Sequence, residues 1–190
     1  MPYFPIFIDP AEKRCVVVGG GAVASRKAGI LLSFGAKVDA IDPAPGAAIQ
    51  NLAPASTLLK RTYAGPDDLT GALLVIAATN NRAVNRQVAE DAKSLGIPVN
   101  VADDPALCTF FFPGIVRRGA VVIGLSSSGC CPGLTARLRK LLESLISPDL
   151  GTALETLKTE GRRIKVWGGN LDPLITRIRP QSPDAESPGD

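Results

Sequence analysis

The sequence predicts an α/β protein built on a doubly wound parallel sheet, and three observations lead to this expectation. The first is an apolar run from Cys15 to Val18, which is typical of a parallel strand buried on both faces. The second is a glycine-rich turn that follows this run at once and leads into a helical pattern over 24–34. The third is the return of such apolar runs further along the chain, separated by helical patterns, as in successive strand–helix–strand units.

The glycine turn has the spacing G-x-G-x-x-A, which is the fingerprint of dinucleotide binding when it joins a strand to a helix. Gly19 allows the tight turn, Gly21 lets the backbone approach a pyrophosphate, and the small Ala24 lets the helix lie close to the strand. The helix N-terminus then offers free N–H groups to phosphate oxygens. The pattern therefore predicts a Rossmann-type sheet that binds a dinucleotide through Gly19, Gly21, Ala22 and Val23.

The next predicted strand, 37–42, ends in Asp42, about 20 residues after the glycine turn. A carboxylate at this place binds the adenine ribose hydroxyls and repels a 2′-phosphate, so Asp42 favours NAD over NADP. Lys37 and Arg26 favour NADP instead if Asp42 points away from the cofactor. For Arg26 and Lys27, in the first turns of the helix, two interpretations stay open: a solvated helix face, or contact with an anionic ligand.

Three further strands complete the predicted sheet. A short third strand includes 58–59, and the fourth covers 72–78 and ends at Thr79. A helix over 82–95 leads to the fifth strand, 97–101. Because open α/β sheets bind ligands at the carboxyl ends of their strands, Thr79 is a candidate cofactor contact.

Polar residues within and after the fifth strand are the candidates for catalysis. Asn100 is unusual in a buried strand and needs hydrogen-bond partners; we assign it to the cofactor site. Asp103 and Asp104 follow at the strand's carboxyl end. Asp104 precedes Pro105, and such a pair is also common in plain turns. Asp103 is therefore the predicted catalytic carboxylate.

The character of the chain changes after Pro113. A basic turn, 116–119, precedes a strand over 120–125, a serine-rich turn, and a helix from about 133 to 147. Cys131 suits the position before the helix and Pro132 its first residue. The serine turn fits either an anion site or a plain helix cap.

Composition narrows the class of protein. The 190 residues carry a net charge of +3 with 5% aromatic residues, which does not suggest nucleic-acid binding. No apolar run approaches the roughly 20 residues of a membrane span, and Met1–Pro5 lacks the basic start of a secretory signal. Four cysteines without metal-type spacing, and no histidine, predict a reduced cytoplasmic protein without a metal site.

The predicted organisation has four parts: an NAD-binding Rossmann domain over 1–113, a small α+β dimerisation and substrate-loop segment over 114–147, a helical region over 148–179, and a disordered tail over 180–190. The apolar arm Phe4–Ile8 is expected to pack beside the first strand.

Several motifs together resemble the precorrin-2 dehydrogenases, which include the N-terminal part of siroheme synthases. The resemblance runs in one order over about residues 3–147. It rests on Phe4-Pro5-Ile6-Phe7, Val17-Val18-Gly19-Gly20-Gly21-x-Val23-Ala24-x-Arg26-Lys27, Ile76-Ala77-Ala78-Thr79, Val99-Asn100-Val101-x-Asp103-x-Pro105, Phe110-x-x-Pro113 and Ser126-Ser127-x-Gly129-x-x-Pro132.

This resemblance implies NAD-dependent oxidation of precorrin-2 to sirohydrochlorin, in a dimer formed through the segment after Pro113. It implies that Asp103 is the catalytic aspartate, that Ser126 and Ser127 form a loop on the tetrapyrrole side, and that some members also insert ferrous iron. A separate uroporphyrinogen methyltransferase and a separate chelatase are the expected functional partners. The chain departs from the family pattern at Asn80-Asn81, where two aspartates are common, and at Ser128 and Cys130-Cys131.

The expected chemistry agrees with the residues. Oxidation transfers a hydride to NAD and releases a proton, and without histidine a carboxylate is the natural base. A substrate with many carboxylates is attracted by basic side chains, for which Arg117, Arg118 and Arg137 are candidates, Arg117 and Arg137 foremost. Two rival functions stay open: a regulatory module that senses NAD without catalysis, and a dehydrogenase for a small substrate.

Overall fold

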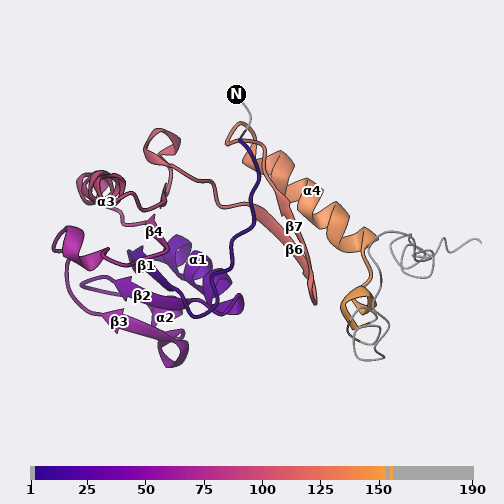
Figure 1. Ribbon diagram of the computed structural model, residues 1–190, viewed down its shortest axis with the longest axis horizontal. Helices are drawn as coiled ribbons and strands as arrows, with labels where there is room; N and C mark the ends of the chain where they lie inside the picture. The colour runs from indigo at the N-terminus through magenta and orange to yellow at the C-terminus, as the bar shows by residue number, and fades with distance from the viewer. Residues whose placement is uncertain (1–2, 153–154, 156–190) are drawn as a thin grey trace, which may run out of the picture. The chain divides into compact units, whose positions relative to one another are not determined.

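The computed structural model describes residues 3–152 and 155 (Figure 1). In this part the chain forms two compact units. One unit comprises residues 6–112, and the other comprises residues 3–5 together with the described residues from 113 onward.

The unit 6–112 contains one parallel sheet with the strand order β3-β2-β1-β4-β5, as the predicted doubly wound fold requires (Figure 1). The chain moves outward from β1 to β3, then returns to the other side of β1 for β4 and β5. The strands are β1 (Arg14–Val18), β2 (Lys37–Ile41), β3 (Ser56–Leu59), β4 (Leu74–Ala77) and β5 (Val99–Val101). The helices are α1 (Ala22–Ser33), α2 (Ala47–Gln50) and α3 (Arg82–Ser94).

The sheet is buried on both faces because its strands are apolar at successive positions. In β1, Cys15 and Val17 face a cluster that includes residues of α1 and Ile49 of α2. Val16 and Val18 face the opposite cluster, which includes residues of α3. Alternate side chains of a strand point to opposite faces, so one continuous apolar run supplies both cores.

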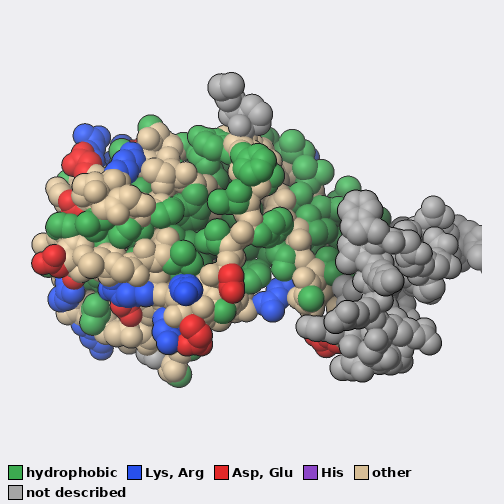
Figure 2. Space-filling model, viewed as in Figure 1, with side chains coloured by type: hydrophobic (Ala, Val, Ile, Leu, Met, Phe, Trp, Pro, Cys, Tyr) green, Lys and Arg blue, Asp and Glu red, His purple; other side chains and the backbone are tan. Residues whose placement is uncertain are grey.

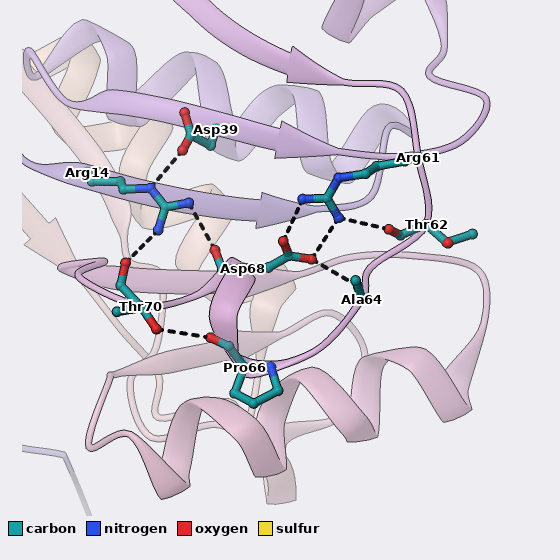
Figure 3. A network of polar contacts seen from close by, with 8 residues as sticks. All are labelled: Arg14, Asp39, Arg61, Thr62, Ala64, Pro66, Asp68 and Thr70. Carbon is teal, nitrogen blue, oxygen red and sulfur yellow. Dashed lines mark hydrogen bonds and ion pairs between the residues drawn. The ribbon is translucent and has the colours of Figure 1, made fainter.

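Polar contacts fix the amino ends of the central strands (Figure 3). Arg14, the first residue of β1, donates to the Asp39 carboxylate of β2 at 2.7 Å and to the carbonyl oxygens of Asp68 and Thr70 at 2.9 and 2.8 Å. The Asp68 carboxylate in turn accepts from Arg61 and from the backbone N–H of Ala64. Arg14 thus ties β1 to β2 and to the turn before β4.

The apolar arm does not belong to the core, so its predicted packing beside the first strand is wrong. Phe4, Ile6 and Phe7 are 86%, 71% and 73% exposed. The arm lies outside the five-stranded sheet, and Pro10 is the first buried residue of the described chain. Hydrophobic side chains are also visible at the surface in Figure 2.

The second unit contains an antiparallel hairpin of β6 (Gly114–Arg118) and β7 (Val121–Leu125), followed by α4 (Pro132–Leu145). The basic segment predicted as a turn is therefore mostly a strand, and the turn itself lies at Gly119 with φ +57°. Arg118 donates to the carbonyl oxygens of Glu143 and Ile146, at 2.8 and 3.1 Å, and so binds the end of α4 to β6.

Beyond α4, residues 149–152 are helical. The rest of the predicted helical region 148–179, apart from residue 155, and the predicted tail 180–190 lie outside the described residues. None of the helices in the described part of the chain is long and apolar enough to cross a membrane.

Candidate cofactor and active site

The register of the sheet brings the predicted site residues of the unit 6–112 to one edge. Val18, the last residue of β1, pairs with Ile41 of β2 on one side and with Ala77 of β4 on the other. Ala77 pairs in turn with Val101 of β5. Since the strands are parallel, the residues that follow them all leave the sheet at its carboxyl edge; these are Gly19, Asp42, Thr79 and Asp103.

The three glycines of the turn after β1 have different surroundings. Gly19 is buried with φ +127°, and a β-carbon there would lie 2.3 Å from the carbonyl oxygen of Ala78. A β-carbon on Gly20 would lie 2.9 Å from the carboxyl carbon of Asp42. Gly21 is exposed, and nothing lies within 4 Å of its β-carbon position. The turn is therefore closed against the protein on one side and open to a ligand at Gly21.

Gly21 is also the residue that precedes α1, and no side chain caps the helix there. Its carbonyl oxygen accepts from the N–H and the hydroxyl of Ser25, at 2.9 and 2.8 Å. Ala22 and Val23, the first two helical residues, are both exposed. Helix N–H groups at such an end suit the oxygens of a pyrophosphate, so the turn fits the dinucleotide that the sequence predicts.

Asp42 lies beside this turn. Its Oδ1 accepts the N–H of Ala44 at 2.8 Å, and the N–H of Gly46 donates to the carbonyl oxygen of Gly20 at 3.1 Å. The loop after β2 is therefore held against the glycine turn, with the carboxylate half-buried between them. Lys37 lies at the opposite end of β2 and forms an ion pair with Glu12 at 2.7 Å. It is too distant from the carboxyl edge to bind a phosphate next to Asp42.

Thr79, after β4, is fixed by a residue that the sequence analysis did not identify. Asn85 of α3 is buried, and its Oδ1 accepts from the N–H and hydroxyl of Thr79, at 3.0 and 2.7 Å. Its Nδ2 donates to the carbonyl oxygen of Thr79 at 3.0 Å. Asn81, where the family pattern commonly has aspartate, caps α3 by accepting from the N–H groups of Ala83 and Val84. An amide oxygen serves that capping role as well as a carboxylate does.

Asn100 has the partners that its place in a buried strand requires. Its Oδ1 accepts from the ammonium of Lys27, and its Nδ2 donates to the carbonyl oxygen of Phe110 at 3.0 Å. The ring of Phe112 lies below the ammonium, with its centre 5.7 Å from Nζ. Of the two basic residues in the first turns of α1, Arg26 is exposed and Lys27 is buried. The solvated-face interpretation is therefore wrong for the buried Lys27, whereas the exposed Arg26 fits both interpretations.

Burial lowers the pKa of the Lys27 ammonium from its ordinary value, and the nearby charge of Arg26 adds to this effect. Cys108 and Asp103 oppose the shift by favouring the charged form. Lys27 thus lies within electrostatic reach of Asp103. The polar Asn100 in an apolar strand was the one sequence signal that pointed to a buried partner of this kind.

Asp103 is exposed and has φ +59°, a left-handed conformation that is uncommon for residues other than glycine, asparagine and aspartate. The next residues form a 3₁₀ turn, Pro105–Leu107, after which the Sγ of Cys108 donates to the carbonyl oxygens of Val101 and Asp104, both at 3.4 Å. These contacts hold the loop back against β5. Asp103 itself is exposed, two residues after β5, at the carboxyl edge of the sheet.

The predicted substrate residues belong to the other unit. Ser126 and Ser127 follow β7; the Ser126 hydroxyl accepts the N–H of Ser128, and the Ser127 hydroxyl accepts the N–H of Cys131. Arg117 of β6 and Arg137 of α4 are both exposed. Cys131 precedes α4 and Pro132 begins it, as predicted, and no side chain caps the helix there.

Comparison with known proteins agrees with the geometry of the unit 6–112. Residues 6–114 match the family described as "Putative NAD(P)-binding". The chain is 42% identical over 153 residues to the siroheme synthase of Nitrosomonas eutropha, which covers 80% of this chain and 32% of that protein. It is 44% identical over 153 residues to the siroheme synthase of Methylococcus capsulatus, with the same shares. The chain thus spans about a third of the length of the curated relatives it matches.

Among solved structures, the precorrin-2 dehydrogenase SirC superposes with a TM-score of 0.68 at 24% identity. The match covers 93% of this chain and 89% of that one. It supports the fold: a parallel α/β sheet with the glycine turn at its carboxyl edge.

Proposed function

The chain belongs to this NAD(P)-binding family, and from that membership we propose that it oxidises precorrin-2 to sirohydrochlorin with NAD. The observation that carries the proposal is the identity of 42% and 44% to siroheme synthases over four-fifths of this chain. The family match over residues 6–114 includes the glycine turn and the carboxylate that follows β5. The geometry of the sheet edge suits a dehydrogenase, because the glycine turn after β1 and the carboxylate after β5 leave the sheet at the same edge, with β4 between them.

NAD, when bound, supplies the acceptor for a hydride. The residues of this chain hold and select it. The open position at Gly21 and the N-terminus of α1 receive the pyrophosphate. Asp42 accepts hydrogen bonds from the adenine ribose hydroxyls and excludes a 2′-phosphate. Asn85 holds the Thr79 loop at the edge of the site.

Asp103 has the role of proton acceptor in this proposal. Removal of a hydride from the reduced tetrapyrrole must be balanced by the loss of a proton, and the chain contains no histidine to take it. The exposed carboxylate at the end of β5 reaches outward from the fixed loop 103–108. Asp104 is half-buried, which makes it the weaker candidate.

Substrate recognition is assigned to the second unit. Precorrin-2 carries many carboxylates, and Arg117 and Arg137 are exposed cations that suit them. Ser126 and Ser127 form the turn that, by resemblance, lies on the tetrapyrrole side. The expected exchange of intermediates with a separate uroporphyrinogen methyltransferase and a separate chelatase stays a prediction.

We also propose that the second unit pairs with a second copy of the chain. A two-stranded hairpin with one helix buries too little apolar surface to be stable alone. Its helix α4 exposes three leucines, Leu134, Leu138 and Leu141, at 50%, 42% and 54%. Their spacing places them on one face of the helix, as expected of a contact between subunits.

The decisive experiment mixes the protein with precorrin-2 and NAD under anaerobic conditions and follows the absorbance of sirohydrochlorin. Turnover that depends on the protein and on NAD supports the proposal. Tight NAD binding without turnover indicates a regulatory module instead. Turnover of a small hydroxy acid, but not of precorrin-2, indicates an ordinary dehydrogenase.

A further inference from the structure

A buried ammonium connects α1 to β5 in the unit that carries the candidate cofactor site. Lys27 is only 9% exposed, and its hydrogen-bond acceptor, Asn100, is 5% exposed. The acceptor is a neutral amide oxygen, and the second contact is the face of the Phe112 ring. Within the described residues, Lys27 forms no ion pair with a carboxylate.

Burial of a charge without an anionic partner is costly, so a lysine at this place needs a reason. Packing alone would be served as well by methionine, whose apolar side chain also adapts to irregular core gaps. The Asn100 amide and the Phe112 ring each stabilise the positive charge without neutralising it. The contacts of the ammonium are therefore neutral groups, and the Asp103 carboxylate acts on its charge only through space.

The sheet topology shows which half of a dinucleotide this charge would affect. Asp42 follows β2, so the adenine half belongs on the β2 side of the glycine turn. The nicotinamide half then belongs on the other side, over the ends of β4 and β5. Lys27 reaches toward that side, because its partner Asn100 lies in β5, one residue before the strand ends.

We propose that Lys27 makes bound NAD a stronger oxidant. Its charge favours binding of the reduced cofactor, NADH, over binding of the oxidised cofactor, NAD⁺. The oxidised nicotinamide ring carries a positive charge that the reduced ring lacks. A fixed positive charge nearby therefore weakens binding of NAD⁺ relative to NADH, and the low dielectric around a buried group strengthens this difference. The inference rests on the proposed use of NAD as hydride acceptor, but not on the identity of the substrate.

The test is the ratio of two dissociation constants, that of NAD⁺ divided by that of NADH, measured by calorimetry at pH 7 without substrate. In Lys27→Met we expect this ratio to fall by about three- to tenfold. A tenfold fall corresponds to a midpoint potential of the bound two-electron couple lower by about 30 mV. A merely structural role would weaken both forms equally and leave the ratio unchanged.

Arg26→Met is the matched control, because it removes the neighbouring cation on the same helix from an exposed position. Its ratio should stay within twofold of the wild-type value. If Lys27→Met does not fold, Lys27→Gln retains a hydrogen-bond donor toward Asn100 and should show the same fall. An unchanged ratio in the folded Lys27 variant, or an equal fall in Arg26→Met, overturns the inference. Wild-type protein that binds neither form of the cofactor would instead overturn the proposed function.

Discussion

Gly19 lies directly against Ala78, so that the end of β1 touches the end of β4 through backbone alone. A β-carbon on Gly19 would lie 2.3 Å from the Ala78 carbonyl oxygen, and the N–H of Ala78 donates to the Val18 carbonyl oxygen at 2.8 Å. Gly21, two residues on, has nothing within 4 Å of its β-carbon position. The two glycines of the fingerprint therefore differ: Gly19 is required by the fold, whereas Gly21 leaves open the space in which we propose that the ligand binds.

This difference predicts opposite results for two alanine substitutions. Gly19→Ala should lower the free energy of unfolding by at least about 1–3 kcal/mol, because alanine is strained at φ +127° and also collides with Ala78. The free energy of unfolding of Gly21→Ala should lie within about 0.5 kcal/mol of the wild-type value, but this variant should bind NAD at least tenfold more weakly. Urea denaturation and calorimetry measure the two effects. Gly29→Ala, in an open position of α1, is the control and should preserve NAD affinity. Normal NAD affinity in Gly21→Ala would contradict the assignment.

Cofactor choice should depend on Asp42. The carboxylate is held beside the glycine turn by the Ala44 N–H, while Lys37 is paired with Glu12 at the far end of β2. Catalytic efficiency with NAD should therefore exceed that with NADP at least tenfold, and Asp42→Ala should lose most of this preference by weakening NAD binding. Steady-state kinetics with both cofactors checks the expectation. Comparable efficiencies in the wild type, or unchanged NAD affinity in the variant, would show that Asp42 does not contact the ribose.

The sheet and its carboxyl edge were predictable because each rests on local sequence. The apolar run before the glycine turn predicts β1, and the structure places the acid after β2 at the carboxyl edge, as expected. Gly96, with φ +69°, follows the end of α3 in the left-handed conformation that favours glycine after a helix. These signals depend on backbone conformation and on burial of whole strands, which residue type and spacing encode directly.

Other features depend on contacts between distant residues and could not be predicted. Helical spacing places position 27 on the buried face of α1 with Ala24 and Ala28, and position 26 off that face. The hydrogen-bond partner that allows a lysine to be buried there is Asn100, 73 residues away. The basic residues of β6 suggested a turn because charge is unusual in buried strands, but this strand forms a hairpin with only one partner. The apolar arm suggested core packing, yet it is exposed in the single chain. Hydrophobicity indicates that burial is favourable without showing which surface provides it.

The exposed leucines of α4 should mediate self-association. We expect the wild-type protein to be a dimer at micromolar concentration by light scattering. Leu138→Glu, which places a charge in the middle of the leucine face, should shift it to a monomer. Ala136→Glu adds the same charge on the opposite side of the helix and should leave the dimer intact. A wild-type monomer, or dissociation by both substitutions, would refute the proposed interface.

The cysteines should divide by reactivity. Cys15 is fully buried in β1, and burial raises the pKa of its thiol to about 11, whereas Cys130 and Cys131 are exposed. At pH 8 a thiol reagent should modify two cysteines rapidly in the native protein and Cys15 only after unfolding. The unfolded thiol ionises at a lower pH than the buried one, so the stabilisation from neutral Cys15 is lost as pH rises toward 11. The double variant Cys130→Ser, Cys131→Ser should lack the rapid phase of modification. Rapid modification of Cys15 in the native protein would contradict its burial.

Asp103 provides the most direct test of mechanism, and its backbone dictates the choice of substitution. At φ +59° alanine would add strain, whereas asparagine tolerates this conformation. Asp103→Asn therefore removes the proton acceptor and leaves the loop in place. A carboxylate base contributes about a hundred- to ten-thousandfold to a proton-transfer step, so kcat for precorrin-2 oxidation should fall within that range. NAD affinity, measured by calorimetry, should be unchanged.

The neighbouring carboxylate supplies the control for this experiment. Asp104→Asn alters the half-buried side chain of a residue whose backbone carbonyl oxygen, rather than its carboxylate, accepts a hydrogen bond from the Cys108 thiol. Its kcat should stay within a few-fold of wild type. Full activity in Asp103→Asn, or a larger loss of activity in Asp104→Asn, would show that a group other than Asp103 is the base. The same Asp103→Asn protein, supplied with sirohydrochlorin and ferrous iron, tests whether one carboxylate serves both oxidation and metal insertion. If the wild-type protein dehydrogenates precorrin-2 but does not insert iron, it is a dedicated dehydrogenase that depends on a separate chelatase.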